Sequence, residues 1–296
     1  MSHETVYAIA SGKGGVGKTT TTVNLGAALA SAGRRVVIVD ADLGMANLAG
    51  FIDLDASGQT LHDVLAGDAG IESATYRLGE NLVAVPSGGD LEGYAATSPD
   101  GLGEAIATLA DGADVVLLDV GAGVSHETVL PLGLADAVLI VSTPEPASVH
   151  DATKTVDLTE RAGGEVAGLV VTRTRPEGDV DPAAIADSVD VPLLGSIPDD
   201  PRVRESVYAG TPLVLHAPDS PASVAYRQLA ADLAGIEPPA DGGDSATDGG
   251  DSATDGGDSA TESDDGYGEL TDEGGVASHD EVSSAITEAE SASDSD

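Results

Sequence analysis

TVYAIASGKGGVGKTT, residues 5–20, contains the strongest indication of the architecture of the chain. Its first six residues are an aliphatic run typical of a buried strand, and the pattern G-x-x-x-x-G-K-[ST] follows from Gly12 to Thr19. Loops of this pattern hold phosphates between a strand and the N-terminus of a helix. We therefore expect a strand over 5–10, a phosphate-binding loop after it, and a helix that begins near Lys18.

The positions of this loop have different expected tasks. The glycines let backbone N–H groups converge on phosphate oxygens, and the helix directs the positive end of its dipole at the same anion. Lys18 is expected to reach the β- and γ-phosphates, the Thr19 hydroxyl to coordinate Mg²⁺, and Thr20 to donate to the α-phosphate. The predicted nucleotide contacts of the loop are Gly12, Lys13, Gly14, Gly15, Val16, Gly17, Lys18, Thr19 and Thr20.

The remainder of the first 238 residues alternates aliphatic runs with helical stretches. The strand-like runs are 5–10, 35–40, 81–88, 114–121, 136–143, 166–173 and 191–198, and the main helical stretches are 18–32, 100–111, 147–162, 201–209 and 220–235. Such alternation indicates βαβ units and a parallel sheet. Aromatic residues are only 2% of the chain, so the core must be aliphatic, which suits strands buried on both faces. We predict one α/β domain over 1–238, with a single doubly wound, mostly parallel sheet.

Three aspartates follow predicted strands. Asp40 and Asp42 come at the end of the run at 35–40, and Asp119 follows four aliphatic residues. Open α/β sheets bind their ligands at the carboxyl ends of the strands. An aspartate after an aliphatic run is also the Walker B pattern, whose carboxylate holds Mg²⁺. The sequence thus predicts ATP and Mg²⁺ as cofactors, with Asp119 at the metal.

The charge of the chain is extreme. It has 52 acidic and 12 basic residues, a formal net charge of −40. Such a charge destabilises a compact chain by self-repulsion unless molar salt, with a Debye length of about 3 Å, screens it. We therefore expect a halophile with a salt-loaded cytoplasm. We also expect a cytoplasmic protein, because the sequence shows neither a signal peptide nor an apolar run long enough to span a membrane.

Metal sites other than the magnesium site are not indicated. The chain has no cysteine, which excludes disulfides and thiolate metal sites. The six histidines lack ligand spacing; they are His3, His62, His126, His150, His216 and His279.

The composition changes beyond Pro238. The segment DGGDSAT occurs three times, at 241–247, 248–254 and 255–261, and residues 241–296 contain no Lys or Arg. A chain of this kind buries too little apolar surface to offset the entropy of ordering. We predict an acidic low-complexity tail over 239–296 that is disordered over 241–278. A weak helical pattern at 278–289 allows either a short helix or a frayed end.

The loop has a second lysine, which gives it the form K-G-G-V-G-K-T-T over 13–20. This form resembles the deviant Walker A loop of the MinD/ParA family of dimeric ATPases. The resemblance implies that Lys13 reaches across a nucleotide-sandwich dimer to the phosphates bound by the partner, as an arginine finger does. Lysine occurs only at Lys13, Lys18 and Lys154, so two of the three stand in this loop.

The resemblance covers residues 1–236. In DADLGMANL (40–48), it implies that Asp42 positions or deprotonates the attacking water and that Asp40 supports the Mg²⁺ shell. The runs VVTRT (170–174) and IPDDPRVRESVYAGTPLV (197–214) match family segments that border the base. The predicted base contacts are Thr172, Arg173, Pro198 and Asp199, the predicted catalytic residues are Lys13, Lys18 and Asp42, and the predicted metal-site residues are Thr19, Asp40 and Asp119.

Two positions depart from the family pattern. Thr172 stands where the family often has asparagine, and Gly121 stands where the loop after Asp119 more often has proline. The first bears on how the base is recognised, and the second on the geometry of the loop beside the γ-phosphate.

Several branches of the family remain to be distinguished. Iron–sulfur carriers and the nitrogenase iron protein need cysteine ligands and are excluded. DNA-partition ATPases need clustered Lys and Arg, whereas nine arginines are spread thinly here, so DNA binding is not expected. The acidic tail also lacks the basic amphipathic helix with which MinD proteins bind anionic lipid, so we expect any membrane contact to run through a partner.

The best fit is the MinD branch. We expect an ATPase that forms an ATP-dependent homodimer, responds to an activating or cargo protein, and positions cell machinery such as the division site. A DNA-partition ATPase and a nucleotide-dependent scaffold with little turnover are the alternatives.

Overall fold

The computed structural model of the protein describes residues 5–55, 57–89, 97–98, 101–123 and 126–236. The predicted tail over 239–296, with its three repeats and the weak helical pattern at 278–289, lies outside the described residues.

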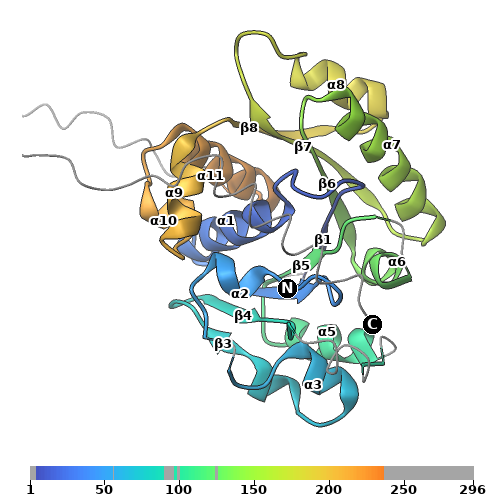
Figure 1. Cartoon of the computed structure of the whole chain (residues 1–296), viewed down its shortest axis with the longest axis vertical. Coiled ribbons are helices and arrows are strands. Elements are labelled where there is room, and N and C mark those ends of the chain that lie inside the picture. The colour runs from blue at the N-terminus through green and yellow to red at the C-terminus, as the bar shows by residue number, and fades with distance from the viewer. Residues whose placement is uncertain (1–4, 56, 90–96, 99–100, 124–125, 237–296) are drawn as a thin grey trace, which may run out of the picture. The chain divides into compact units, whose positions relative to one another are not determined.

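The described strands form one eight-stranded sheet (Figure 1). In sheet order they are β3 (Tyr76–Arg77), β4 (Leu82–Val85), β2 (Val36–Ala41), β5 (Val115–Val120), β1 (Thr5–Ala10), β6 (Ala137–Ser142), β7 (Val166–Thr174) and β8 (Leu193–Pro198). The short β3 runs antiparallel to β4, and the other described pairs are parallel. The predicted mostly parallel sheet is therefore confirmed.

Helices connect the strands. They are α1 (Lys18–Ser31), α2 (Leu48–Phe51), α3 (Leu61–Ala66), the 3₁₀ helix η1 (Ile71–Ala74), α5 (Leu102–Ala110), α6 (His126–Leu134), α7 (Pro146–Arg161), α8 (Pro182–Val189), α9 (Pro201–Tyr208), α10 (Leu213–His216) and α11 (Pro221–Ala234). Four of them begin with proline, whose fixed φ suits the first helical position. Among the described residues, no helix is long and apolar enough to cross a membrane.

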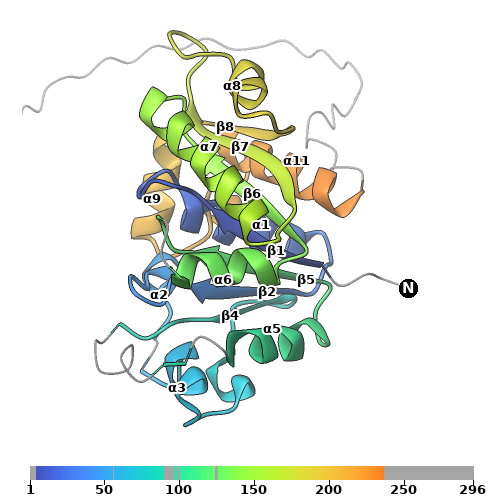
Figure 2. The same cartoon turned by 90° about the vertical axis from the view of Figure 1, so that its right-hand side faces the viewer.

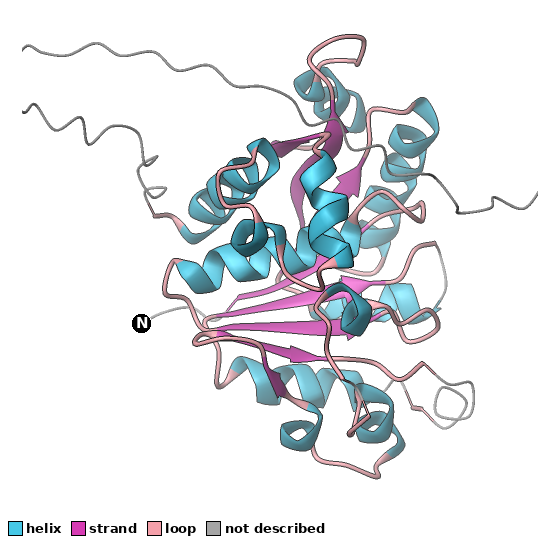
Figure 3. Ribbon diagram, turned by 60° about the vertical axis from the view of Figure 1, so that its left-hand side comes forward, coloured by secondary structure: helices cyan, strands magenta, loops and turns pink. Residues whose placement is uncertain are grey.

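The sheet separates two aliphatic cores. Alternate residues of a strand point to opposite faces, so Ile38 packs in one core while Val39 packs in the other. The first core contains residues of α1 and α11, and the second contains residues of α5, α7 and α8. Figures 2 and 3 show the helices on both sides of the strands. Burial on both faces explains why the strands read as continuous aliphatic runs.

The topology places the loop after β1 where the direction of sheet growth changes. Strands β2 to β5 lie on one side of β1, and β6 to β8 lie on the other. Open α/β sheets bind ligands at such a switch point, at the carboxyl ends of the strands. In β2 and β5, Asp40 and Asp119 are register partners at that end of the sheet. The predicted loop and the predicted carboxylates thus meet at one edge.

Candidate nucleotide-binding site

The glycine loop between β1 and α1 is shaped to leave its inner side open. Gly15 and Gly17 have φ angles of +77° and +100°, a left-handed conformation that favours glycine. A Cβ atom on Gly14 or Gly15 would meet nothing within 4 Å, whereas one on Gly12 would lie 2.5 Å from the carbonyl oxygen of Asp151 in α7. The loop therefore packs tightly at its start and stays clear in its middle, as a phosphate cradle requires.

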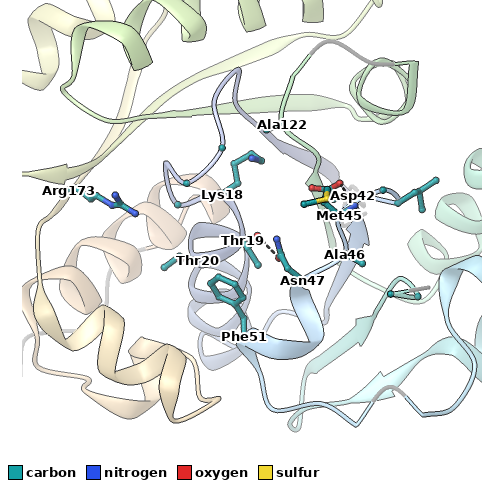
Figure 4. Close-up of a pocket in the computed structure, with 17 residues that line it drawn as sticks. Lys18, Thr19, Thr20, Asp42, Met45, Ala46, Asn47, Phe51, Ala122 and Arg173 are labelled. Atoms are coloured by element: carbon teal, nitrogen blue, oxygen red, sulfur yellow. Dashed lines mark hydrogen bonds between the residues drawn. The ribbon is translucent and has the colours of Figure 1, made fainter. Parts of the chain in front are cut away.

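A cavity of about 660 Å³, here called the central cavity, opens above this loop. Its lining includes Gly14, Gly15, Gly17, Lys18, Thr19, Thr20, Asp42, Asn47, Phe51, Gly88, Gly89, Ala122 and Arg173. Figure 4 shows Arg173 on one side of the loop and Asp42 on the other. The predicted residues Lys18, Thr19 and Asp42 are therefore brought together around one space.

Lys18 is the first residue of α1 and is 9% exposed. Burial lowers the pKa of its ammonium group, and the nearby charges of Asp119 and Asp42 act in the opposite direction. A buried ammonium group needs a compensating negative charge. The helix N-terminus adds backbone N–H groups at the same point, so the site suits an anion with several oxygens.

Asp119, at the end of β5, lies behind the loop. Its side chain accepts a hydrogen bond from Thr22 Oγ1 at 3.3 Å, and the residue is 2% exposed. Burial raises the pKa of its carboxyl group to about 6, an effect opposed by the hydroxyl of Thr19 and the charge of Lys18. Asp119 and Thr19 thus present oxygen donors on adjacent elements, which is the donor chemistry Mg²⁺ prefers.

Asp40 is almost completely buried and does not line the central cavity. Its carboxylate accepts backbone N–H groups from Asp42 at 3.2 Å and from Asn47 and Leu48 at 3.1 Å each. Burial is the main cause that raises the pKa of Asp40 to about 7, and the charge of Asp119 is the second. Asp40 therefore organises the segment of residues 42–47, here called the switch segment, and its predicted support of a metal shell stays a prediction.

Asp42 begins the switch segment and lines the central cavity. Its Oδ1 accepts the N–H of Met45 at 3.1 Å. A Cβ atom on Gly121 would lie 2.9 Å from this same oxygen, so the loop after β5 passes directly against Asp42. This close approach explains why glycine suits position 121, where a side chain would displace Asp42.

Two residues that the sequence did not single out complete the site. Asn47 accepts a hydrogen bond from Thr19 Oγ1 at 2.9 Å, which joins α1 to the switch segment (Figure 4). Phe51 of α2 also lines the cavity. Asn47 directly precedes α2, and a polar residue before a helix is the available signal, although it indicates a cap rather than a site.

A second cavity of about 680 Å³, here called the side cavity, adjoins the first. Both are lined by Gly17, Thr20, Phe51 and Arg173. The side cavity is further lined by Thr172, Pro198 and Asp199, the residues predicted to border the base. Its continuity with the phosphate loop gives room for a nucleoside attached to the phosphates.

The hydroxyl of Thr172 faces the loop rather than open space. Its Oγ1 lies 2.6 Å from the carbonyl oxygen of Val16 and 3.2 Å from that of Ser142, and the residue is 4% exposed. The side chain of Asp199 is paired with Arg175, at 2.7 Å between Nη2 and Oδ2. Base contacts by these two side chains stay predictions, while Thr172 has an observed role in holding the loop.

Lys13 is not among the residues that line the central cavity. Its Nζ is 3.3 Å from Oε2 of Glu145.

Among the described residues, no cluster of three or more His, Asp or Glu side chains forms a metal site. A magnesium ion that keeps several waters and binds through Thr19, one carboxylate and phosphate oxygens needs no such cluster.

The comparison with known families decides which family the chain belongs to. Residues 7–213 match the CobQ/CobB/MinD/ParA nucleotide binding domain. The chain belongs to this family. The chain is therefore a MinD/ParA-family P-loop protein, and the glycine loop, the aspartates and the two adjoining cavities form its candidate nucleotide-binding site.

Individual members of the family are similar over most of their length. An ATP-binding protein of Methanocaldococcus jannaschii is 41% identical over 231 residues, which are 78% of this chain and 88% of that protein. The septum site-determining protein MinD of Synechocystis is 35% identical over 242 residues, 79% of this chain and 91% of that protein.

Solved structures of family members have the same fold. MinD of Pyrococcus horikoshii in complex with Mg-ADP has a TM-score of 0.74 at 38% identity and covers 77% of this chain and 95% of its own. The MinC:MinD complex of Aquifex aeolicus has a TM-score of 0.71 at 29% identity and covers 79% of this chain and 98% of its own.

Proposed function

We propose that the protein is a MinD-like ATPase that binds Mg-ATP, dimerises around the nucleotide, hydrolyses it slowly, and positions cell machinery such as the division site. The observation that carries the proposal is the arrangement of Lys18, Thr19 and Asp42 around one cavity that continues into a space of nucleoside size. The Mg-ADP complex of a MinD protein 38% identical to this chain supports the choice of nucleotide and metal.

Each part of the site has a role in this proposal. The loop and the N-terminus of α1 bind and orient the phosphates, and Lys18 neutralises their charge. Thr19 and Asp119 hold Mg²⁺, which when bound stabilises negative charge on the phosphoryl group. Asp42, which lines the central cavity, positions or deprotonates the attacking water. Lys13 adds a positive charge at the phosphates bound by a partner subunit.

The positioning role is inferred from relatives. Several similar proteins are septum site-determining MinD proteins, and one solved structure is a complex of MinD with MinC. We therefore propose an activating or cargo protein that recognises the ATP-bound dimer. A cytoplasmic location, with the membrane reached through such a partner, belongs to the same proposal.

Four of the described cations outside the loop are held in ion pairs, which argues against the DNA-partition alternative. Arg35 pairs with Asp114, Lys154 with Asp151, Arg175 with Asp199 and Arg202 with Glu205, each within 4 Å. A cation paired with a carboxylate releases few counterions from DNA, and counterion release drives non-specific DNA binding.

The test is ATP turnover in buffer containing molar KCl, measured as phosphate release, for the wild type and Asp42→Ala. Mg-ATP binding is measured alongside by calorimetry. We expect both proteins to bind ATP with similar affinity, and only the wild type to hydrolyse it. Binding without turnover in the wild type, with and without candidate partners, would instead favour a nucleotide-dependent scaffold.

A second assay separates the cellular roles. Co-sedimentation with DNA and with anionic liposomes, each with and without ATP, is run in the same buffer. The proposal expects neither to pellet the protein in the absence of a partner. ATP-dependent sedimentation with DNA would support the partition ATPase.

A further inference from the structure

A buried histidine holds the switch segment from the side that faces away from the central cavity. His62 is the second residue of α3 and is 3% exposed. Its Nε2 lies 3.0 Å from the carbonyl oxygen of Leu43. A carbonyl oxygen can only accept a hydrogen bond, so Nε2 carries the proton and donates it. The acceptor belongs to the residue directly after Asp42.

The position of His62 is fixed by the loop after β4. The N–H of Leu61 donates to the carbonyl oxygen of Pro86 at 2.8 Å, and Ser87 Oγ donates to the carbonyl oxygen of Asp40 at 2.7 Å. Thr60 and Asp63 form a capping box at the start of α3. The histidine is thus mounted on a helix whose first turn is tied to the strand end that carries Asp40.

Gly88 connects this support to the central cavity. A Cβ atom on Gly88 would lie 2.7 Å from Nδ1 of His62, so the backbone of the loop passes against the edge of the imidazole ring. Gly88 itself lines the central cavity. The backbone of Gly88 therefore lies between the central cavity and the imidazole ring of His62.

Asp42 is therefore held between two anchors. The carboxylate of Asp40 accepts N–H groups from both ends of the switch segment. None of its hydrogen bonds involves the peptide group between residues 43 and 44. His62 holds that peptide group through the carbonyl oxygen of Leu43, directly after Asp42.

We infer that His62 is a positioning residue for Asp42, which it holds toward the central cavity by donating to the carbonyl group of Leu43. The inference rests on the proposed ATPase function. His62 does not line the cavity, so its effect is expected on turnover and not on nucleotide binding.

Two substitutions of His62 separate the hydrogen bond from packing. His62→Phe keeps a ring of similar size but has no donor, whereas His62→Gln places an amide N–H at a similar reach. Leu65→Ala, a buried position of the same helix, is the control for general weakening of α3. Turnover, ATP affinity and hydrogen exchange of the amides of residues 42–48 are measured for each variant and for the wild type.

The inference expects His62→Phe to lower kcat about tenfold, because small displacements of a catalytic group cost one to two orders of magnitude in rate. ATP affinity should stay within about twofold, since the lost interaction acts in the chemical step. Exchange at residues 42–48 should become faster in His62→Phe, return toward the wild-type rate in His62→Gln, and stay near it in Leu65→Ala.

Wild-type turnover and exchange in His62→Phe would overturn the inference, and so would equal losses in His62→Phe and Leu65→Ala. If the wild type itself hydrolyses no ATP, the proposed ATPase function fails, and exchange alone decides the inference. Faster exchange in His62→Phe with recovery in His62→Gln would then uphold the positioning role, and unchanged exchange would overturn it.

Discussion

Lys13 and Glu145 form an ion pair within one chain, with Nζ 3.3 Å from Oε2. Glu145 is the residue directly before α7, and its Oε2 also accepts a hydrogen bond from Thr143 Oγ1 at 3.2 Å. The hydrogen bond from Lys13 lowers the pKa of the Glu145 carboxyl group most, and the bond from Thr143 lowers it further. In the single chain, therefore, Lys13 is bound to a carboxylate that does not line the central cavity.

Glu145→Gln should release Lys13 for contact with a partner subunit. Exposed ion pairs contribute little, so we predict that ATP-dependent dimerisation strengthens by no more than a factor of about five. Sedimentation velocity with Mg-ATP in molar KCl measures the dimer fraction over a concentration series. A variant that no longer dimerises would contradict this account and place Glu145 in the interface itself.

Thr172→Val should weaken nucleotide binding, although it replaces none of the residues predicted to contact the phosphates. The substitution keeps the shape of the side chain but removes the hydroxyl that donates to the carbonyl oxygen of Val16 at 2.6 Å. An unsatisfied buried carbonyl group costs about 1–3 kcal/mol, so the cradle should become less ordered and ATP affinity should fall about tenfold.

Thr159→Val is the matched control for Thr172→Val. Thr159 is also buried, and its hydroxyl donates to a carbonyl group within α7, at Thr155. Calorimetric titration with Mg-ATP compares the two variants. Equal affinity losses would indicate general destabilisation and would argue against a specific hold on the loop.

Asp119→Asn should change how stability depends on pH in the absence of nucleotide. Burial raises the pKa of Asp119 to about 6, above the value near 4 of an unfolded chain. Between these two values the folded state binds more protons than the unfolded state, so the carboxylate destabilises the protein increasingly as pH rises through this window. The stability of Asp119→Asn relative to the wild type should therefore increase from about pH 4 to about pH 7, by on the order of 1–3 kcal/mol.

Urea unfolding at several pH values and constant KCl measures this difference. Asp114→Asn is a control with the opposite sign, because hydrogen bonds from Arg35 lower the pKa of Asp114. Its carboxylate stabilises the fold above about pH 4 and loses this effect below that value. A flat difference for Asp119→Asn would show that its carboxyl group has an ordinary pKa.

Local sequence patterns were sufficient to predict most of the fold. The run at 5–10 and the structure agree on β1, and the predicted helix over 18–32 differs from α1 by one residue. Both predictions rest on signals within a few residues: an aliphatic run, glycines and a helix start. The two-residue β3 and the short α2, α3 and η1 went unpredicted, because tertiary packing rather than a periodic pattern stabilises elements of that length.

The site shows the same division. The motifs located Lys18, Thr19, Asp42 and Asp119, because each follows a strand or a glycine loop in the chain. They could not show that Thr172 holds Val16 or that His62 holds Leu43, because these pairs are 156 and 19 residues apart and meet only in the folded chain. A threonine or histidine in a sequence carries no sign of which distant carbonyl group it will reach.

If ATP joins two subunits through Lys13, the mass of the protein in molar KCl with Mg-ATP, measured by light scattering, must depend on this lysine. Asp42→Ala serves as the background, so that nucleotide is not consumed. Lys13→Ala is compared with Lys154→Ala, which removes the one lysine outside the loop. We expect a dimer for Asp42→Ala alone and with Lys154→Ala, and a nucleotide-bound monomer with Lys13→Ala. An ATP-dependent dimer that persists in the Lys13→Ala protein would contradict the proposed role of Lys13.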